Sequence, residues 1–164
     1  ISSLDGHIGD GAGFATTSLS VGVHTITASV TDSASQAGQD EVTVTVSNTP
    51  LPTTMAVADL DGMGAPAGRV LWQATVSIMV MDNLGGPVDG AVVSGAWSAG
   101  TNSFGTCTTG ASGTCDISAG KLKKNVSSVT FSVTGIDGSL TYTPGDNGDP
   151  DGDSDGTNIT ILKP

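Results

Sequence analysis

Val70-Leu-Trp-Gln-Ala-Thr-Val-Ser-Ile-Met-Val-Met81 is the longest strand-like run in the chain. Within it, apolar side chains recur at every second position, with Met79 and Met81 on the opposite side from Ala74, Val76, Ile78 and Val80. Because successive side chains of a strand point to opposite faces of a sheet, this period of two predicts a long strand packed against a core.

Shorter runs of the same kind surround this segment. We expect strands at residues 56–59, 91–97, 103–109, 114–118, 126–136, 140–143 and 158–162. Glycine-rich turns separate them, and the chain holds 24 Gly with only 4% aromatic and 13% charged residues. About seven strands at this spacing predict an antiparallel β-sandwich with no need for a helix.

The first part of the chain predicts a smaller β structure. Val23–Val30 and Val42–Val46 alternate apolar residues with Thr and Ser, and Asp32–Gly38 has the composition of a connecting turn. Phe14–Leu19 is a candidate third strand. A free-standing sandwich of this type needs about seven strands, so we expect upstream chain or a neighbouring subunit to complete residues 1–47.

A stretch with two prolines separates the two parts. Residues 48–54 read Asn-Thr-Pro-Leu-Pro-Thr-Thr, which is typical of a short, semi-rigid linker. The predicted fold class is therefore all-β, with two tandem antiparallel β-sandwich modules at residues 1–47 and 55–164, of which the first is incomplete.

The most acidic segment of the chain resembles a calcium loop. In Asp146–Gly156, Asp151, Asp153, Asp155 and Gly156 stand where an EF-hand loop has positions 1, 3, 5 and 6. Position 12, which should be a bidentate Glu, is Leu162, in a segment that reads as a strand rather than as a helix. The alternative is a solvated acidic linker, because Gly, Asp, Asn and Ser also compose flexible loops.

Crowding of carboxylates favours a bound cation. Each pair of like charges about 6 Å apart in water costs roughly 0.7 kcal/mol, and a divalent ion reverses that repulsion. Strand directions in a sandwich place the start of the second module near this loop, which adds two acidic residues to the candidates. The predicted ligands for Ca²⁺ are Asp59, Asp61, Asp146, Asn147, Asp149, Asp151, Asp153 and Asp155.

The chain has two cysteines, and their setting predicts a disulfide bond. Cys107 and Cys115 flank Thr-Thr-Gly-Ala-Ser-Gly-Thr, a turn composition that we expect to form a hairpin and to bring the two Cα atoms within disulfide reach. The rival interpretation, a reactive thiol, requires a neighbour that lowers the thiol pKa, and the local sequence offers none.

Several functions are disfavoured by composition. A net charge of -11 with five basic residues argues against a nucleic-acid partner or an anionic membrane surface. No run approaches eighteen apolar residues, so we expect no membrane insertion. The chain has one Glu, and neither His7 nor His24 has a partner at catalytic or ligand spacing, so we expect no enzyme activity. Trp72 and Trp97 fit core positions better than the alternative, stacking on a polysaccharide.

Two segments carry family resemblances. Ser-Ser-Leu-Asp-Gly-His-Ile-Gly, Ser-Leu-Ser-Val-Gly-Val-His-Thr-Ile-Thr-Ala-Ser-Val-Thr-Asp-Ser and Glu-Val-Thr-Val-Thr-Val, within residues 2–47, resemble the last half of PKD-like or Ig-like repeats of secreted bacterial proteins. Val-Ser-Ile-Met-Val-Met-Asp-Asn-Leu-Gly-Gly-Pro-Val-Asp-Gly-Ala-Val-Val-Ser-Gly, followed by Gly-Thr-Cys-Thr-Thr-Gly-Ala-Ser-Gly-Thr-Cys, is similar to invasin-type bacterial Ig-like domains. That half also resembles accessory domains appended to secreted hydrolases, notably subtilisin-like peptidases.

These resemblances imply an exported or cell-surface bacterial protein. The expected function is a non-catalytic accessory or spacer module, stabilised by calcium and a disulfide. The alternative is a surface adhesin or a filament-forming protein, and its partner would be a polysaccharide or protein surface.

Overall fold

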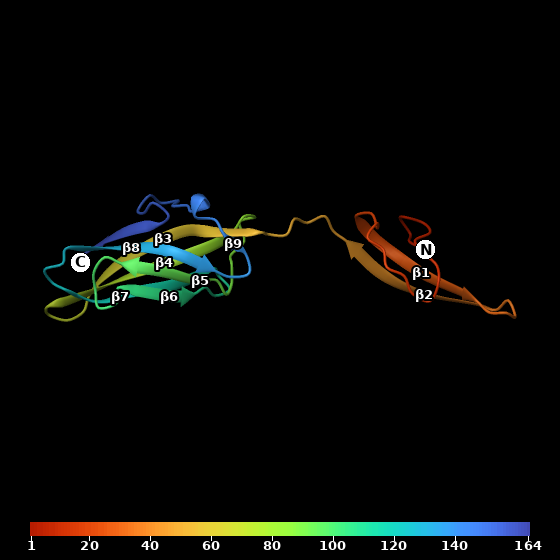
Figure 1. Cartoon of the computed structure of the whole chain (residues 1–164), viewed down its shortest axis with the longest axis horizontal. Helices are drawn as coiled ribbons and strands as arrows, with labels where there is room; N and C mark the ends of the chain where they lie inside the picture. The colour runs from red at the N-terminus through yellow and green to blue at the C-terminus, as the bar shows by residue number, and fades with distance from the viewer. The chain divides into compact units, whose positions relative to one another are not determined.

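The computed structural model describes residues 1–164 and divides them into two compact units, Ile1–Leu51 (unit 1) and Pro52–Pro164 (unit 2). Both units are built from β-strands, and the only helical segment is a single 3₁₀ turn, as Figure 1 shows. The all-β fold class is thus confirmed. The boundary between the units falls inside the proline-containing stretch at residues 48–54.

Unit 1 is a two-stranded hairpin with a long N-terminal segment. Strand β1 (Gly22–Thr31) pairs antiparallel with β2 (Ala37–Val46). The turn between them is held by Asp32, whose Oδ1 accepts hydrogen bonds from the backbone N–H groups of Ala34 (2.8 Å) and Gln36 (2.9 Å). The first residues of the chain run beside β1, where the Thr27 N–H donates to the Ile1 carbonyl at 2.8 Å.

The expected third strand at Phe14–Leu19 is wrong, because this segment forms no strand. Its hydroxyl groups bond locally instead: Thr16 Oγ1 accepts from the Ser18 N–H at 3.3 Å and lies 3.0 Å from Ser18 Oγ. Side chains of Ser and Thr that bond to nearby backbone in this way compete with a strand ladder.

Unit 1 buries almost nothing apolar. Its fully buried side chains are the polar Ser2 and His24, whereas Val30 and Val42 are 69% and 57% exposed. A two-stranded hairpin is marginally stable without further packing. Unit 1 therefore owes its shape largely to hydrogen bonds.

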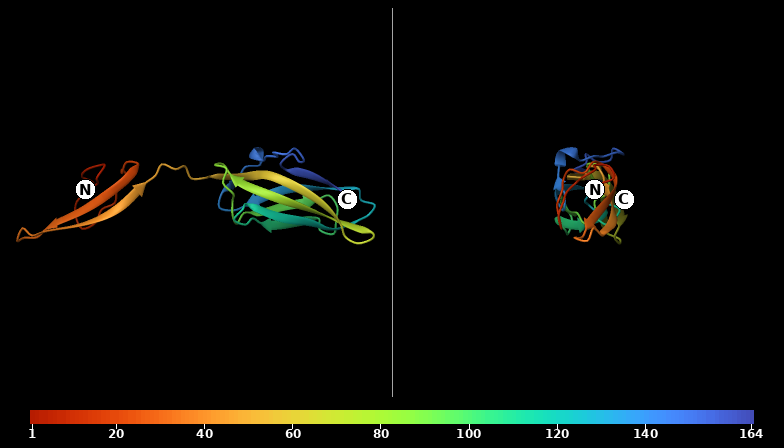
Figure 2. Two further views of the ribbon diagram at one scale, coloured as in Figure 1. Left: turned by 180° about the vertical axis from the view of Figure 1, so that it is seen from behind. Right: turned by 90° about the vertical axis from the view of Figure 1, so that its right-hand side faces the viewer.

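Unit 2 is a sandwich of two four-stranded sheets (Figures 1 and 2). One sheet has the strand order β10-β8-β5-β6 and the other β7-β4-β3-β9. In chain order the strands are β3 (Thr54–Pro66), β4 (Leu71–Asp82), β5 (Val92–Trp97), β6 (Phe104–Thr108), β7 (Thr114–Lys123), β8 (Ser128–Asp137), β9 (Thr141–Tyr142) and β10 (Asn158–Leu162).

Two features of unit 2 differ from the expected pattern. The first strand was expected to end at Asp59, but β3 continues to Pro66 because its second half pairs with β4 as far as Pro66↔Trp72. The sheets are not wholly antiparallel either, since the short strand β9 pairs parallel with β3 through Thr54↔Thr141 and Met55↔Tyr142.

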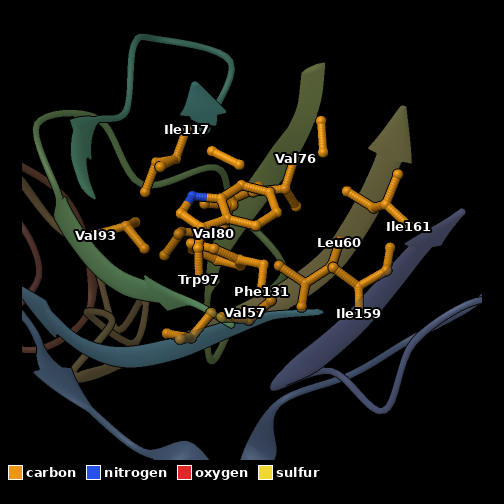
Figure 3. Packing of buried hydrophobic residues seen from close by; sticks show 14 of the residues in the cluster. Val57, Leu60, Val76, Val80, Val93, Trp97, Ile117, Phe131, Ile159 and Ile161 are labelled. Carbon is orange, nitrogen blue, oxygen red and sulfur yellow. The ribbon is translucent and has the colours of Figure 1, made fainter. Parts of the chain in front are cut away.

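The core lies between the two sheets of unit 2. The alternating residues of β4 (Ala74, Val76, Ile78 and Val80) are each 0% exposed. Both tryptophans belong to this core, as predicted, and the Trp97 ring meets Phe131 with ring centroids 4.9 Å apart (Figure 3). Burial of large side chains such as these contributes roughly 1.5 to 3 kcal/mol each before the entropy cost of ordering them.

The two sheets meet along two edges, and chain segments join them differently at each. At one edge β6 and β7 lie side by side, and Cys107 of β6 is bonded to Cys115 of β7 with their Cα atoms 5.8 Å apart. The disulfide was predicted correctly, but β6 and β7 belong to different sheets, so it fastens one sheet to the other rather than closing a hairpin.

At the opposite edge β3 approaches β10. A Cβ atom on Gly62 would lie 2.6 Å from Ile161 Cγ1, and one on Gly64 would lie 2.7 Å from the Leu162 carbonyl oxygen. Glycine is needed at both positions for the two strands to come this close. Figure 3 shows Leu60 of β3 beside Ile159 and Ile161 of β10 at this edge.

Candidate metal centre

A β-bulge in β3 places two acidic side chains on the outside of the sandwich. Met55 and Val57 are buried at alternate positions, and continuation of that alternation would put Asp59 in the core. The pairing of β3 with β4 instead shifts register between Val57 and Asp59, so Leu60 takes the next buried position. A bulge of this kind redirects the side chains that follow it, and Asp59 and Asp61 then share the outer face.

The loop before β10 is anchored to β3 next to this bulge. The Gly148 N–H donates to the Val57 carbonyl at 2.8 Å, and the Val57 N–H donates to Asn147 Oδ1 at 3.0 Å. Asn147 Nδ2 in turn donates to the Tyr142 hydroxyl at 2.9 Å and to Thr157 Oγ1 at 3.0 Å. These bonds fix the start of the loop against β3 and tie its end, at Thr157, to its start.

The middle of the loop is organised by Asp149. Its two carboxylate oxygens accept hydrogen bonds from the Gly152 N–H (3.2 Å) and the Ser154 N–H (3.0 Å). Gly156 closes the loop with φ of 76°, a left-handed conformation, and a Cβ atom there would lie 2.8 Å from the Gly148 carbonyl oxygen. The glycine at this position is therefore required both by the backbone conformation and by the close approach.

Five carboxylates from β3 and the loop converge in two overlapping groups. Oxygen atoms of Asp59, Asp149 and Asp151 lie within 4.8 Å of one another, and so do oxygen atoms of Asp61, Asp151 and Asp153. Asp151 belongs to both groups. We call these five residues the acidic cluster.

No basic side chain neutralises the acidic cluster. The ion pairs of the molecule are both in unit 1, between His7 and Asp10 and between His24 and Asp5. No positive charge therefore offsets the repulsion between these carboxylates, and the repulsion favours their protonated forms. Burial, and then the charge of Asp61, raises the pKa of Asp59; burial, and then the charge of Asp151, raises the pKa of Asp153.

Three other predicted ligands lie outside the acidic cluster. Asp146 ends the 3₁₀ turn (Pro144–Asp146) and is exposed. The Asn147 amide is occupied by the hydrogen bonds described above. The carboxylate of Asp155 accepts from the Asn158 side chain and from the Thr157 and Asn158 N–H groups, which lowers the pKa of Asp155 and fixes the start of β10.

The arrangement suits a hard cation chemically. Carboxylate oxygens are the ligands that Ca²⁺ and Mg²⁺ prefer, and the acidic cluster offers no nitrogen or sulfur ligand. The residues come from two segments about 90 positions apart in the chain, so an ion held by both would connect them. Alternate spacing of Asp indicated the loop residues, whereas the bulge that turns Asp59 outward had no signal in the sequence.

A second cluster of reactive side-chain types surrounds His24 in unit 1. His24 is fully buried, with Ser2 Oγ 2.8 Å and Asp5 Oδ2 3.5 Å from the same ring nitrogen, Nδ1, while Nε2 bonds to the Ser20 carbonyl at 2.7 Å. A catalytic triad would place the hydroxyl and the carboxylate on opposite nitrogens. This cluster instead ties the N-terminal segment to β1.

The structure contains no helix with the length and hydropathy that a membrane crossing requires. Comparisons with models of known protein families, with curated proteins and with solved structures found no match for this chain.

Proposed function

We propose that the chain is a non-catalytic accessory or spacer module of an exported bacterial protein, and that unit 2 binds Ca²⁺ at the acidic cluster. The observation that carries the proposal is the convergence of five unneutralised carboxylates from β3 and from the loop before β10. One ion, or two that share Asp151, would join the two sheets at the edge where no covalent bond connects them.

Export is supported by the disulfide. Disulfides persist in oxidising surroundings and are rare in the cytosol. Extracellular calcium modules bind with dissociation constants of about 0.1 to 1 mM, which suits a site that stays filled outside the cell. In this role the module keeps a fixed shape while other parts of the protein act on a substrate.

Calcium-dependent thermal unfolding tests the proposal. At a tenfold excess of free ion over the dissociation constant, binding to the native state alone adds roughly 1.4 kcal/mol to the free energy of unfolding. We therefore expect the Tm of unit 2 to rise by about 5 °C or more in millimolar Ca²⁺ relative to EDTA.

Matched variants locate the effect. Asp151→Asn removes a carboxylate common to both groups, and Asp153→Ala removes one from the second group, so both should lose most of the rise. Asp116→Asn, an exposed acidic residue of β7 outside the acidic cluster, should keep it. An unchanged Tm across millimolar Ca²⁺ would favour the solvated acidic linker instead.

A second candidate function, a surface adhesin or filament protein, is favoured by unit 1. Ala28, Val30 and Val42 lie on one side of the hairpin and are exposed. Further strands, from upstream chain or from a neighbouring subunit, would cover this side and pair with the free edge of β2. Strand addition between subunits is a recurrent means of building filaments.

Hydrogen exchange distinguishes these roles. If unit 1 requires another strand, its β2 amides should exchange many times faster than those of β8 at low protein concentration, because local opening costs little. Protection that increases with concentration would support assembly through unit 1. Equal protection of β2 and β8 in the dilute chain would mean that unit 1 is complete without a partner.

A further inference from the structure

One outer face of unit 2 differs from the rest of this acidic molecule because it is nearly free of charge. The sheet β10-β8-β5-β6 contains a single charged residue, Asp137, at the end of β8. The side chains that alternate with its buried residues are mostly Ser and Thr. The other sheet, by contrast, carries Asp and Lys on β3, β4 and β7.

The hydroxyl groups of this face are held in place by one another. Thr130 Oγ1 lies 3.0 Å from Thr160 Oγ1, and the Ser132 hydroxyl donates to Asn158 Oδ1 at 2.6 Å. The Ser98 hydroxyl accepts from the Thr130 N–H at 2.9 Å. A ligand that binds here meets polar groups that are already ordered, which lowers the entropy cost of binding.

An exposed aromatic ring borders a shallow hollow on the same face. Phe104, the first residue of β6, is 74% exposed. The hollow beside it is lined by Ser94, Thr106, Thr134 and the backbone of Gly95 and Gly105. A bulge between β5 and β8 lies at this point and leaves Thr134 as an extra residue in the ladder.

This combination matches the chemistry of a neutral sugar chain. The apolar face of a pyranose ring packs on an aromatic ring, and its hydroxyls exchange hydrogen bonds with Ser, Thr and backbone groups. Charge selects among occupants: a cationic partner would prefer the acidic surfaces of a chain with a net charge of -11, and an anionic partner would be repelled by them. An uncharged polymer is neither drawn to the acidic surfaces nor repelled by them, so it can bind this nearly uncharged face.

We propose that the face around Phe104 binds a neutral polysaccharide, with a pyranose ring stacked on Phe104 and hydrogen-bonded to Ser94, Thr106 and Thr134. The site is separate from the acidic cluster and does not depend on a bound cation. Binding there should be weak for a single sugar and stronger for a chain that extends across the strands toward Asn158.

Co-sedimentation of the purified chain with microcrystalline cellulose, chitin and starch granules tests this assignment, with affinity electrophoresis in alginate as the anionic comparison. We expect retention on at least one neutral polymer. It should be insensitive to salt, because no ion pairs are involved, and it should persist in EDTA. Phe104→Ala should weaken binding about tenfold, and Phe104→Trp should preserve it.

Met63→Ala serves as the matched control, because Met63 is 65% exposed on β3 in the other sheet. Unchanged retention in this variant supports assignment to Phe104. Three results would overturn the proposal: no retention on any neutral polymer, equal loss in both alanine variants, or a Phe104→Ala effect confined to self-association of the chain in sedimentation velocity.

Discussion

The two edges of the unit 2 sandwich are closed by different chemistry. At the β6–β7 edge a covalent bond joins Cys107 to Cys115, and it holds regardless of the ions in solution. At the β3–β10 edge the two strands touch through glycine backbone, and beside them five carboxylates repel one another. The first edge is covalently fastened, whereas the second has no covalent bond and lies beside the proposed Ca²⁺ site.

If the acidic cluster binds Ca²⁺ as proposed, one edge of unit 2 is independent of ions in solution and the other is stabilised by them. Because the disulfide holds one edge, we expect local opening of the sandwich to begin at the β3–β10 edge. In the proposed function, Ca²⁺ at the acidic cluster would strengthen that edge, and its removal would leave the hydrogen bonds between Val57 and the loop before β10 to hold it.

The largest expected effect comes from removing the covalent edge. Replacing both cysteines with alanine should lower the free energy of unfolding of unit 2 by roughly 2 to 3 kcal/mol, the value that the chain-entropy model gives for a nine-residue loop. Chemical denaturation with and without Ca²⁺ measures this. Because the acidic cluster is intact in the variant, Ca²⁺ should still raise the free energy of unfolding by the same amount. Loss of that increase would show that the two edges are not independent.

A smaller effect is expected from crowding the other edge. Gly64→Ala places a Cβ atom against the Leu162 carbonyl oxygen, so β3 and β10 must move apart, at a cost of about 1 to 2 kcal/mol. The same movement should weaken Ca²⁺ binding.

Gly135→Ala is the control for this substitution, because a Cβ atom there meets nothing within 4 Å. Calcium titrations should therefore give a higher dissociation constant for Gly64→Ala than for Gly135→Ala. Equal calcium affinity in both would indicate that β3 takes no part in the site.

The smallest effect concerns pH. The pKa values of Asp59 and Asp153 are raised in the ion-free fold, first by burial and then by neighbouring charges. A raised folded-state pKa contributes stability below the unfolded pKa that is lost as pH rises through the folded value. In EDTA, unit 2 should thus gain a little stability as pH falls from about 7 toward 4.

In Ca²⁺ the trend should reverse over the same range, because protons then compete with the ion for these carboxylates. The lowered pKa of Asp155 acts in the opposite direction as pH falls toward the unfolded value, so the upper part of this range gives the clearest comparison. Melting curves at several pH values, with and without Ca²⁺, check the prediction. Parallel pH profiles in the two conditions would contradict it.

Much of this fold could be predicted from the sequence because alternation and turn composition are local patterns. Alternation predicted β4 and β8, and the turn between Cys107 and Cys115 indicated their bond. What could not be predicted from alternation is that β6 and β7 join different sheets, because that depends on which strands each of them pairs with elsewhere in the chain. The absence of a strand at Phe14–Leu19 has a local cause instead, since Thr16 and Ser18 bond to each other.

The candidate site shows the same division. The spacing of Asp151 and Asp153 indicated a cation loop, but it also suggested Asp155, which the structure occupies with hydrogen bonds to Asn158. Asp59 belongs to the acidic cluster because of a bulge in β3 that no residue pattern predicts. Spacing along a loop identifies candidate ligands for a cation, whereas tertiary contacts determine which of these carboxylates converge.

A calcium titration followed by two-dimensional ¹⁵N NMR of the native chain tests most directly whether a cation at the acidic cluster connects the two sheets. If the ion connects the two sheets, the Leu60 amide of β3, which donates to the Asp59 carboxylate, should shift together with the loop amides of Gly152 and Ser154 and with the same dissociation constant. The Gly113 amide, at the disulfide edge, should stay unchanged. Shifts confined to the loop, or no shift at millimolar Ca²⁺, would contradict the claim that a cation closes the β3–β10 edge.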